Sequence, residues 1–149
     1  MRHGFAVVLA LALLVPIGVG AADDVGRVKV VKGMVTIQRS GGNLPATVGM
    51  NLLEGDVIAT GRDGSAGVTF NDDSLLSVGP ESVLAIDRFA FDSTTHAGRF
   101  DTSLRQGTLS AVSGKIAKQS PDAMKVRTPS TILGVRGTEF VVRAAPVTP

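Results

Sequence analysis

The sequence predicts a single small all-β domain, built as a β-sandwich or β-roll from many short strands. Few windows show the apolar spacing of an amphipathic helix, whereas Gly, Ser, Thr and Asp interrupt the chain at short intervals. Short runs rich in β-branched residues stand between these interruptions, as expected for short strands joined by turns. Because the 149 residues include no cysteine, disulfide bonds are excluded and an ordinary apolar core must hold the domain together.

The first residues differ from the rest and are typical of a secretory signal peptide. Arg2 and His3 are followed by a run from Phe5 to Gly20 that contains no charged residue and ends in small residues. An uncleaved membrane anchor is the alternative. A spanning helix needs about 20 apolar residues, and this run is shorter and contains Pro16.

Cleavage would leave a single domain outside the cytoplasm. We expect residues 1–21 to be the signal peptide, residues 22–149 to form the exported domain, and its core to span about residues 30–143. The later apolar stretches are too short to span a bilayer, so we expect no membrane insertion after cleavage. The expected location is periplasmic or secreted.

Nine runs of the exported part are predicted as strands because they are short, apolar and bounded by turn residues. Gly33 suits a tight hairpin, Asp63-Gly64 is a two-residue turn signal, Asn71–Asp73 is rich in turn-forming side chains, and Gly79 precedes a proline. The predicted strands are Arg27–Val31, Met34–Arg39, Val57–Thr60, Ala66–Phe70, Leu75–Val78, Val83–Asp87, Gly107–Val112, Met124–Thr128 and Thr138–Arg143.

Three serines mark a near-regular spacing in the middle of the chain. Ser65, Ser74 and Ser82 each precede a short apolar segment, at intervals of nine and eight residues. A β-meander produces this spacing and so does one face of a short β-solenoid, which therefore stays as the alternative architecture. The polar stretches Asp92–Arg99 and Lys115–Asp122 are expected to be exposed connections.

The sequence offers no residue set typical of a catalytic site, and we expect no enzyme activity. Covalent catalysis needs a nucleophile beside a base, and the exported part has one histidine, His96, in a polar stretch. Glycosidases use two carboxylates, and the glutamates available are Glu54, Glu81 and Glu139. Trp and Tyr, which give sugar-binding sites flat amphipathic surfaces, are missing from the sequence.

Metal, cofactor and nucleic-acid binding are not expected either. One histidine and no cysteine do not make a zinc site, and Asn71, Asp72 and Asp73 lack the spacing of a calcium loop and suit a turn. No phosphate-binding loop is present, so we predict no cofactor. The formal net charge of +2 is spread along the chain and phenylalanine is the only aromatic residue, which argues against a nucleic-acid partner.

Arg136 is the most unusual residue, because it stands between Gly134 and Gly137 in an otherwise apolar stretch. We expect a buried structural residue whose guanidinium satisfies carbonyls or a carboxylate, since an unpaired buried charge is costly. The alternative is an exposed contact with a ligand or partner, beside glycines that allow close approach.

The C-terminal stretch and three earlier motifs resemble the FecR domain family. Thr128-Pro129 followed by Ile132–Val142 is similar to the family's closing signature, and Gly55–Thr60 is similar to its Gly-Asp-x-Ile-x-Thr motif. The resemblance covers about Val30–Val142, nearly all of the exported part, and four motifs in the same order make it specific. The residues that carry it are Gly55, Asp56, Gly64, Ser65, Gly79, Thr128, Pro129, Gly134, Arg136, Gly137, Thr138 and Phe140.

The resemblance implies a β-rich, non-enzymatic module of the periplasm or of secreted proteins. In the best-known members this module senses the state of an outer-membrane receptor and relays it to a sigma factor, through a cytoplasmic region and a transmembrane helix that precede it. A signal peptide is expected in their place here. The resemblance therefore implies a protein-interaction or envelope-signalling module whose partner is an envelope protein. A cell-wall or glycan-binding domain is the alternative.

Overall fold

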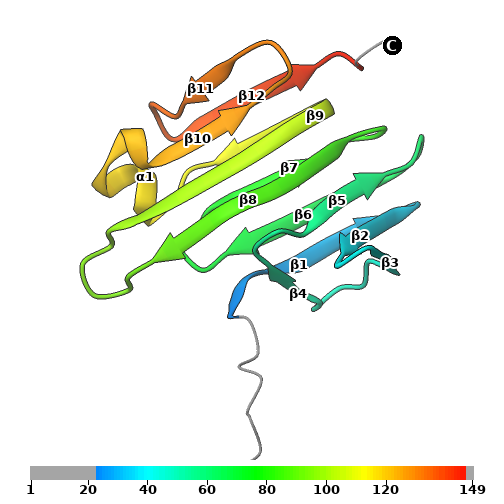
Figure 1. Cartoon of the computed structure of the whole chain (residues 1–149), viewed down its shortest axis with the longest axis horizontal. Coiled ribbons are helices and arrows are strands. Elements are labelled where there is room, and N and C mark those ends of the chain that lie inside the picture. Colours follow the sequence, from blue (N-terminus) through cyan, green and yellow to red (C-terminus); the bar gives the residue numbers. More distant parts are fainter. Residues whose placement is uncertain (1–22, 147–149) are drawn as a thin grey trace, which may run out of the picture.

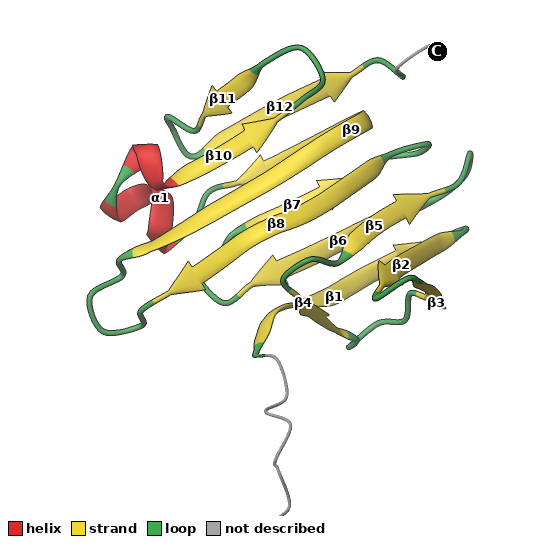
Figure 2. Cartoon of the chain, viewed as in Figure 1, coloured by secondary structure: helices red, strands yellow, loops and turns green. Residues whose placement is uncertain are grey.

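Strands dominate the structure, a computed structural model that describes residues 23–146; the predicted signal peptide lies outside these residues. Within them the helices are limited to one short α-helix and one 3-10 turn (Figure 2), so the all-β prediction is confirmed. The strands are β1 (Asp24–Lys32), β2 (Val35–Arg39), β3 (Gly42–Pro45), β4 (Asn51–Leu53), β5 (Val57–Thr60), β6 (Ser65–Phe70), β7 (Leu75–Val78), β8 (Val83–Phe91), β9 (Gly98–Val112), β10 (Met124–Arg127), β11 (Ile132–Gly134) and β12 (Glu139–Ala144), and the helices are α1 (Lys115–Gln119) and η1 (Pro121–Ala123).

The strands form one strongly curled sheet (Figure 1), whose main path has the order β3-β2-β5-β8-β9-β7-β6-β1-β4. Neighbouring strands are antiparallel, except that β10 runs parallel to β9. The curl places β2, β3, β5 and β8, which we call the β8 half, opposite β1, β4, β6 and β7, which we call the β7 half. The fifteen-residue β9 belongs to both, with β10 and β11 extending the β8 half and β12 the β7 half.

Three pairs of consecutive strands each form one long strand that crosses from one half of the sheet to the other. β1 continues as β2, β5 as β6 and β7 as β8, and their pairings match on the two halves. β9 is the fourth long strand, because its first part pairs with β8 and its second part with β7. The fold is therefore a meander of long antiparallel strands folded over along one line. This corner line consists of Gly33–Met34, Gly61–Gly64, Gly79–Ser82 and Gly107–Thr108.

Backbone hydrogen bonds join each corner to its neighbour. The Gly61 amide donates to the Met34 carbonyl at 2.9 Å, and the Glu81 amide donates to the Gly61 carbonyl at 3.0 Å. The Gly79 amide donates to the Thr108 carbonyl at 2.9 Å. Because these bonds continue the sheet's ladders around the bend, the polar groups of the corners stay satisfied.

The prediction of a tight hairpin at Lys32-Gly33 is wrong. Gly33 does adopt a positive φ of 60°, but β1 and β2 do not pair with each other; β1 pairs with β6 and β2 pairs with β5. The turn at Asn71–Asp73, by contrast, joins two paired strands, β6 and β7. A glycine with positive φ marks a reversal of the chain in both a hairpin and a corner, so the local signal does not separate them.

The curl encloses one apolar core to which both halves contribute. The alternation of buried and exposed residues is clearest in β6, where Ala66, Val68 and Phe70 point inward. Phe70 also packs with Phe89 and Phe100, with ring centroids 5.5 and 4.5 Å from its own. Aromatic pairs at this spacing add stability beyond the area that they bury.

All nine predicted strands overlap strands of the structure, but three strands were not predicted. β3, β4 and β11 are only three or four residues long and show no clear alternation of buried and exposed positions. The hairpin of β8 and β9 extends further than expected and leaves Asp92–Ala97 as its loop. The stretch Lys115–Asp122, expected to be a polar connection, contains α1 and most of η1.

The solenoid alternative does not describe the fold, because the strands along the main path are antiparallel. The serine spacing has a different cause. Ser65 opens β6 beside one corner, Ser74 follows the turn to β7, and Ser82 closes the next corner. The interval of eight or nine residues is one short strand plus the turn or corner that follows it.

Gly107 provides the clearest test of the corner line. Its φ is +96°, and a Cβ at this position would lie 2.0 Å from Ser82 Oγ. We expect Gly107→Ala to lower the free energy of unfolding by more than about 2 kcal/mol, because positive φ alone costs an alanine about 1–2 kcal/mol and Ser82 must also move. Urea unfolding of the purified domain measures the loss.

Gly134→Ala is the matched control. A Cβ on Gly134 meets open space and its φ is not in the positive range, so its stability should stay within about 0.5 kcal/mol of wild type. Equal stability for both variants would show that the bend of β9 does not depend on glycine.

Candidate interaction surface

Gly55 and Asp56 form a structural site on the β4–β5 turn. Gly55 has a φ of +90°, and Asp56 is 1% exposed. The Asp56 carboxylate accepts hydrogen bonds from Arg39 Nε at 2.8 Å and Nη2 at 2.6 Å, and from the Leu53 amide at 2.9 Å. The hydrogen bond from Arg39 to Asp56 raises the pKa of the guanidinium further. This bidentate pair ties β2 to the turn before β5.

Arg39 was not predicted as a site residue, and it supplies a second test. Arg39→Met leaves the buried Asp56 carboxylate with the Leu53 amide as its remaining partner. We expect a loss of about 3–5 kcal/mol, the usual cost of breaking a buried pair from one side. Arg39→Met combined with Asp56→Asn should regain part of this loss, because the stranded charge is gone. Denaturant unfolding of the single and double variants measures the coupling; strict additivity would contradict the pairing.

Gly64, Ser65 and Gly79 lie on the corner line or beside it. A Cβ on Gly64 would lie 2.2 Å from the Met34 carbonyl oxygen, so two corners approach each other there more closely than a side chain allows. The Gly79 carbonyl accepts a hydrogen bond from Thr60 Oγ1 at 2.6 Å. These residues that carry the family resemblance therefore position the corners.

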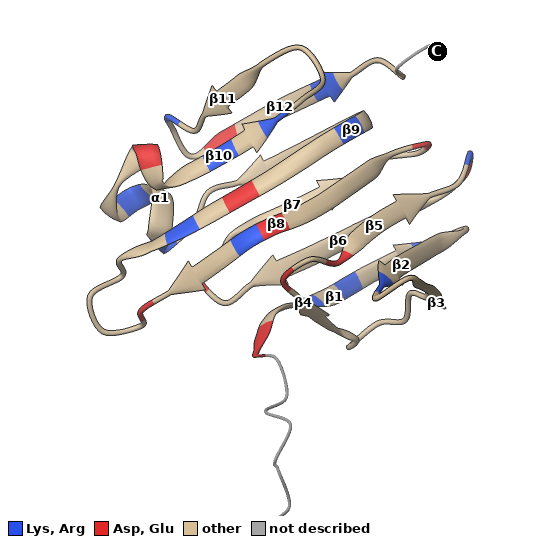
Figure 3. Ribbon diagram, viewed as in Figure 1, with Lys and Arg blue, Asp and Glu red and all other residues tan. Residues whose placement is uncertain are grey.

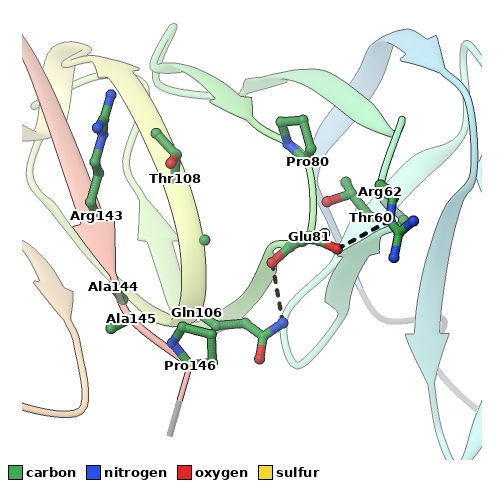
Figure 4. A pocket seen from close by; sticks show the side chains of 12 residues that line it. Thr60, Arg62, Pro80, Glu81, Gln106, Thr108, Arg143, Ala144, Ala145 and Pro146 are labelled. Atoms are coloured by element: carbon green, nitrogen blue, oxygen red, sulfur yellow. Dashed lines mark hydrogen bonds and ion pairs between the residues drawn. The ribbon is translucent and has the colours of Figure 1, made fainter.

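The corner line also lines a hollow with a volume of about 700 Å³ (Figure 4). Glu81 contacts Arg62 at 3.8 Å, and its carbonyl accepts a hydrogen bond from Gln106 Nε2 at 3.1 Å. Figure 4 places Arg143 on the opposite side of the hollow from Arg62. Both members of the Arg62–Glu81 pair are largely exposed, so solvent weakens their attraction.

The Asn71–Asp73 stretch is a turn with a buried carboxylate. Asp72 is fully buried and accepts hydrogen bonds from the Ser74 amide and hydroxyl at 3.1 and 2.8 Å and from the Ile116 amide at 3.3 Å. Lys115, 2.9 Å from the Asp73 carboxylate, lowers the pKa of that group. The oxygens of this turn thus hold the start of α1 against the β6–β7 hairpin.

The candidate acid–base residues are dispersed. His96 lies in the β8–β9 loop, stacked beside Phe91 with ring centroids 6.1 Å apart. Glu54 accepts a hydrogen bond from the Phe89 amide at 3.0 Å, whereas Glu81 lies on the corner line and Glu139 opens β12. These carboxylates stand on separate elements. Among the described residues no group of three or more His, Cys, Asp or Glu side chains could hold a metal ion.

Arg136 is exposed, so the expectation of a buried structural arginine is wrong. It lies between β11 and β12, next to the buried Val135, whose amide donates to the Met124 carbonyl at 3.1 Å. Val135 therefore anchors the segment and directs its neighbour outward. Gly134 has open space around it, and Gly137 has a φ of +107°.

The remaining residues of the C-terminal signature frame this segment. Thr128 and Pro129 form the turn between β10 and β11, where the Thr128 amide donates to the Thr131 carbonyl at 2.8 Å. Thr138 precedes β12 and its carbonyl accepts from the Ser113 amide at 2.8 Å, while Phe140 packs partly against the core. The signature thus surrounds a short exposed strand.

β11 carries two exposed apolar residues. Ile132 is 56% exposed and Leu133 is 38% exposed, and the exposed Arg136 follows them in the chain. Within the described residues β11 pairs with β10 alone, so its other edge is open. We call Ile132, Leu133 and Arg136 the β11 surface. Arginine is enriched among the residues that contribute most to protein–protein contacts, and exposed apolar residues that lie together mark such contacts.

The structure is an all-β domain whose strands bend along the corner line and whose C-terminal segment is exposed. Comparison with known proteins identifies the family to which this domain belongs. Residues 56–148 match the family model described as FecR protein, which is more than half of the 149 residues. The chain therefore belongs to the FecR family, as the motifs indicated. No curated protein and no solved structure matches the chain. The described helices are too short to cross a membrane.

Proposed function

We propose that this protein is a non-enzymatic interaction module of the cell envelope that binds a protein partner through the β11 surface. FecR domains are generally non-catalytic signalling or interaction modules, and the chain belongs to this family. The observation that carries the proposal is the exposure of Ile132, Leu133 and Arg136 within the C-terminal signature.

The contrast between two groups of signature residues supports this assignment. Asp56 and Gly64 have structural roles that their burial and contacts explain. Arg136 and Gly134 make no contact of that kind: the arginine is exposed and a Cβ on the glycine would meet open space. Exposed residues that the fold does not require are better explained by binding.

The described residues offer no exposed aromatic surface of the kind that the glycan-binding alternative requires. All phenylalanines of the described residues are buried or partly buried, and Phe70, Phe89 and Phe100 form the aromatic cluster of the core. A flat sugar-binding surface needs an exposed aromatic face. The protein-partner proposal is therefore preferred.

Export is part of the proposal and has a direct test. We expect residues 1–21 to be removed, because the uncharged run from Phe5 to Gly20 has the length and composition of a signal peptide. Intact-mass measurement of the protein from periplasmic and secreted fractions of its native host should give a chain that begins at Ala22 or Asp23. A full-length chain in the membrane fraction would contradict the proposal.

Site-specific photo-crosslinking in the native host tests the partner surface. A photoreactive residue in place of Ile132 should give a discrete adduct with another protein, and adding Arg136→Ala should reduce that adduct without changing the melting temperature. Val48, 66% exposed in the turn before β4, is the matched control and should give no such adduct. Equal adducts at both positions, or none at Ile132, would contradict the proposed surface.

A further inference from the structure

The outward face of the β8 half gathers basic side chains from three strands. On β9 the inward residues Phe100, Thr102 and Leu104 are buried, so the residues between them point outward. The pairing register places Asp101 of β9 between Arg88 of β8 and Lys125 of β10. Figure 3 shows basic and acidic positions on the neighbouring strands β8, β9 and β10.

Positive charge exceeds negative charge on this face. Five basic residues against two acidic residues leave a formal excess of three positive charges, whereas the whole sequence has a net charge of only +2. We call this group the basic face; its cations are Arg88, Arg99, Arg105, Lys125 and Arg127, and its carboxylates are Asp87 and Asp101.

Most of these cations have no carboxylate partner within the face. Arg99 Nε contacts Asp101 Oδ2 at 3.0 Å, and the Asp87 carboxylate accepts a hydrogen bond from the Ser103 hydroxyl. Among the described residues no ion pair involves Arg88, Arg105, Lys125 or Arg127. Unpaired guanidinium groups are suited to bind carboxylates through two parallel hydrogen bonds.

Two neighbouring hollows, which together we call the groove, lie along this face. One, of about 460 Å³, lies between Arg88, Arg99 and Arg127, and the other, of about 230 Å³, lies between Arg105, Arg127 and the Thr128-Pro129 turn. Arg127 and Ser103 line both. The groove therefore ends at a turn that belongs to the C-terminal signature.

The groove adjoins Ile132 of the β11 surface. The register pairs Arg127 of β10 with Ile132 of β11, and Lys125 with Gly134. Paired residues of neighbouring strands point to the same side of a sheet. Ile132 therefore stands beside the cations, and Gly134 leaves open space next to Lys125.

We propose that the basic face binds an extended acidic segment of the partner protein, with Ile132 as the apolar contact at one end. This inference rests on the proposed function and specifies the chemistry of the partner. Charge complementarity carries it: a segment with Asp or Glu at alternate positions presents its carboxylates on one side, toward the arginines.

The exposed Ile132 beside Arg127 favours a polypeptide over a phosphate polymer. A peptide can place an apolar side chain against Ile132, whereas a phosphate polymer has none.

A fluorescence-anisotropy titration with the peptide Asp-Val-Glu-Val-Asp-Val-Glu-Val tests the proposal. The wild-type domain should bind this peptide at least about tenfold more tightly at 30 mM than at 300 mM NaCl, and more tightly than Asn-Val-Gln-Val-Asn-Val-Gln-Val. Arg88→Glu combined with Arg127→Glu should weaken binding at least about tenfold. Arg88→Gln with Arg127→Gln, expected to weaken it less, avoids new repulsion within the fold.

Lys29→Glu combined with Lys32→Glu is the control, because it changes the net charge equally but on exposed positions of β1 in the β7 half. It should change binding less than about twofold, and all variants should melt within a few degrees of wild type. No peptide binding at low salt, equal losses in the control, or equally tight binding of inorganic polyphosphate would overturn the proposal.

The same charge variants separate this inference from the proposed function. In the cross-linking experiment, an Ile132 adduct that survives Arg88→Glu with Arg127→Glu would overturn the acidic partner and leave the interaction module standing. An absent Ile132 adduct together with tight, charge-dependent peptide binding would support the basic face and contradict the β11 surface.

Discussion

The fold depends on a bend in each long strand, and these bends lie next to one another along the corner line. A sheet of antiparallel strands has two faces and can bury one of them only by packing against another layer. This chain supplies the second layer from the same strands, by folding them over along the corner line. At Gly107 the strand bends within β9 itself, with Ser82 so close that no side chain fits. The core, with its aromatic cluster, exists because all four bends coincide.

This constraint separates the residues of the family resemblance into two groups. Gly64 and Gly79 hold the corners, and Asp56 holds the turn that leads into β5 through its pair with Arg39. The C-terminal group frames β11, which has few contacts with the rest of the fold and is exposed throughout. The folded sheet thus presents a short exposed edge, an arrangement in which the residues of the proposed binding surface do not compete with packing.

The sequence was informative wherever a local rule decides the structure. Short apolar runs between turn residues predicted β6 and β7 to within one residue, and glycine marked the corners even though the hairpin at Gly33 did not form. Contacts between distant segments were not predictable. Arg39 and Asp56 are 17 positions apart in the sequence. The first backbone amides of α1 donate hydrogen bonds to Asp72, which lies more than 40 residues earlier in the chain.

Arg136 shows why the candidate site was harder to predict than the fold. Apolar neighbours suggested burial, but Val135 alone is buried there, while Ile132 and Leu133 are exposed. The basic face was equally hard to predict from the sequence, because its cations are scattered along the chain. Only the register of β8, β9 and β10 brings them together. Pairing between distant strands is set by tertiary packing, which a single sequence does not display.

Native-state hydrogen exchange tests most directly whether the corner line holds the molecule together. The amides of Gly61, Gly79 and Glu81 donate hydrogen bonds from one corner to the next. If the four bends form one cooperative unit, these amides should exchange only through global unfolding, as slowly as those of the core strands. The Thr94 and Thr95 amides, bonded to the exposed Asp92 carboxylate in the β8–β9 loop, should exchange much faster. Corner amides that exchange as fast as this loop would contradict the account.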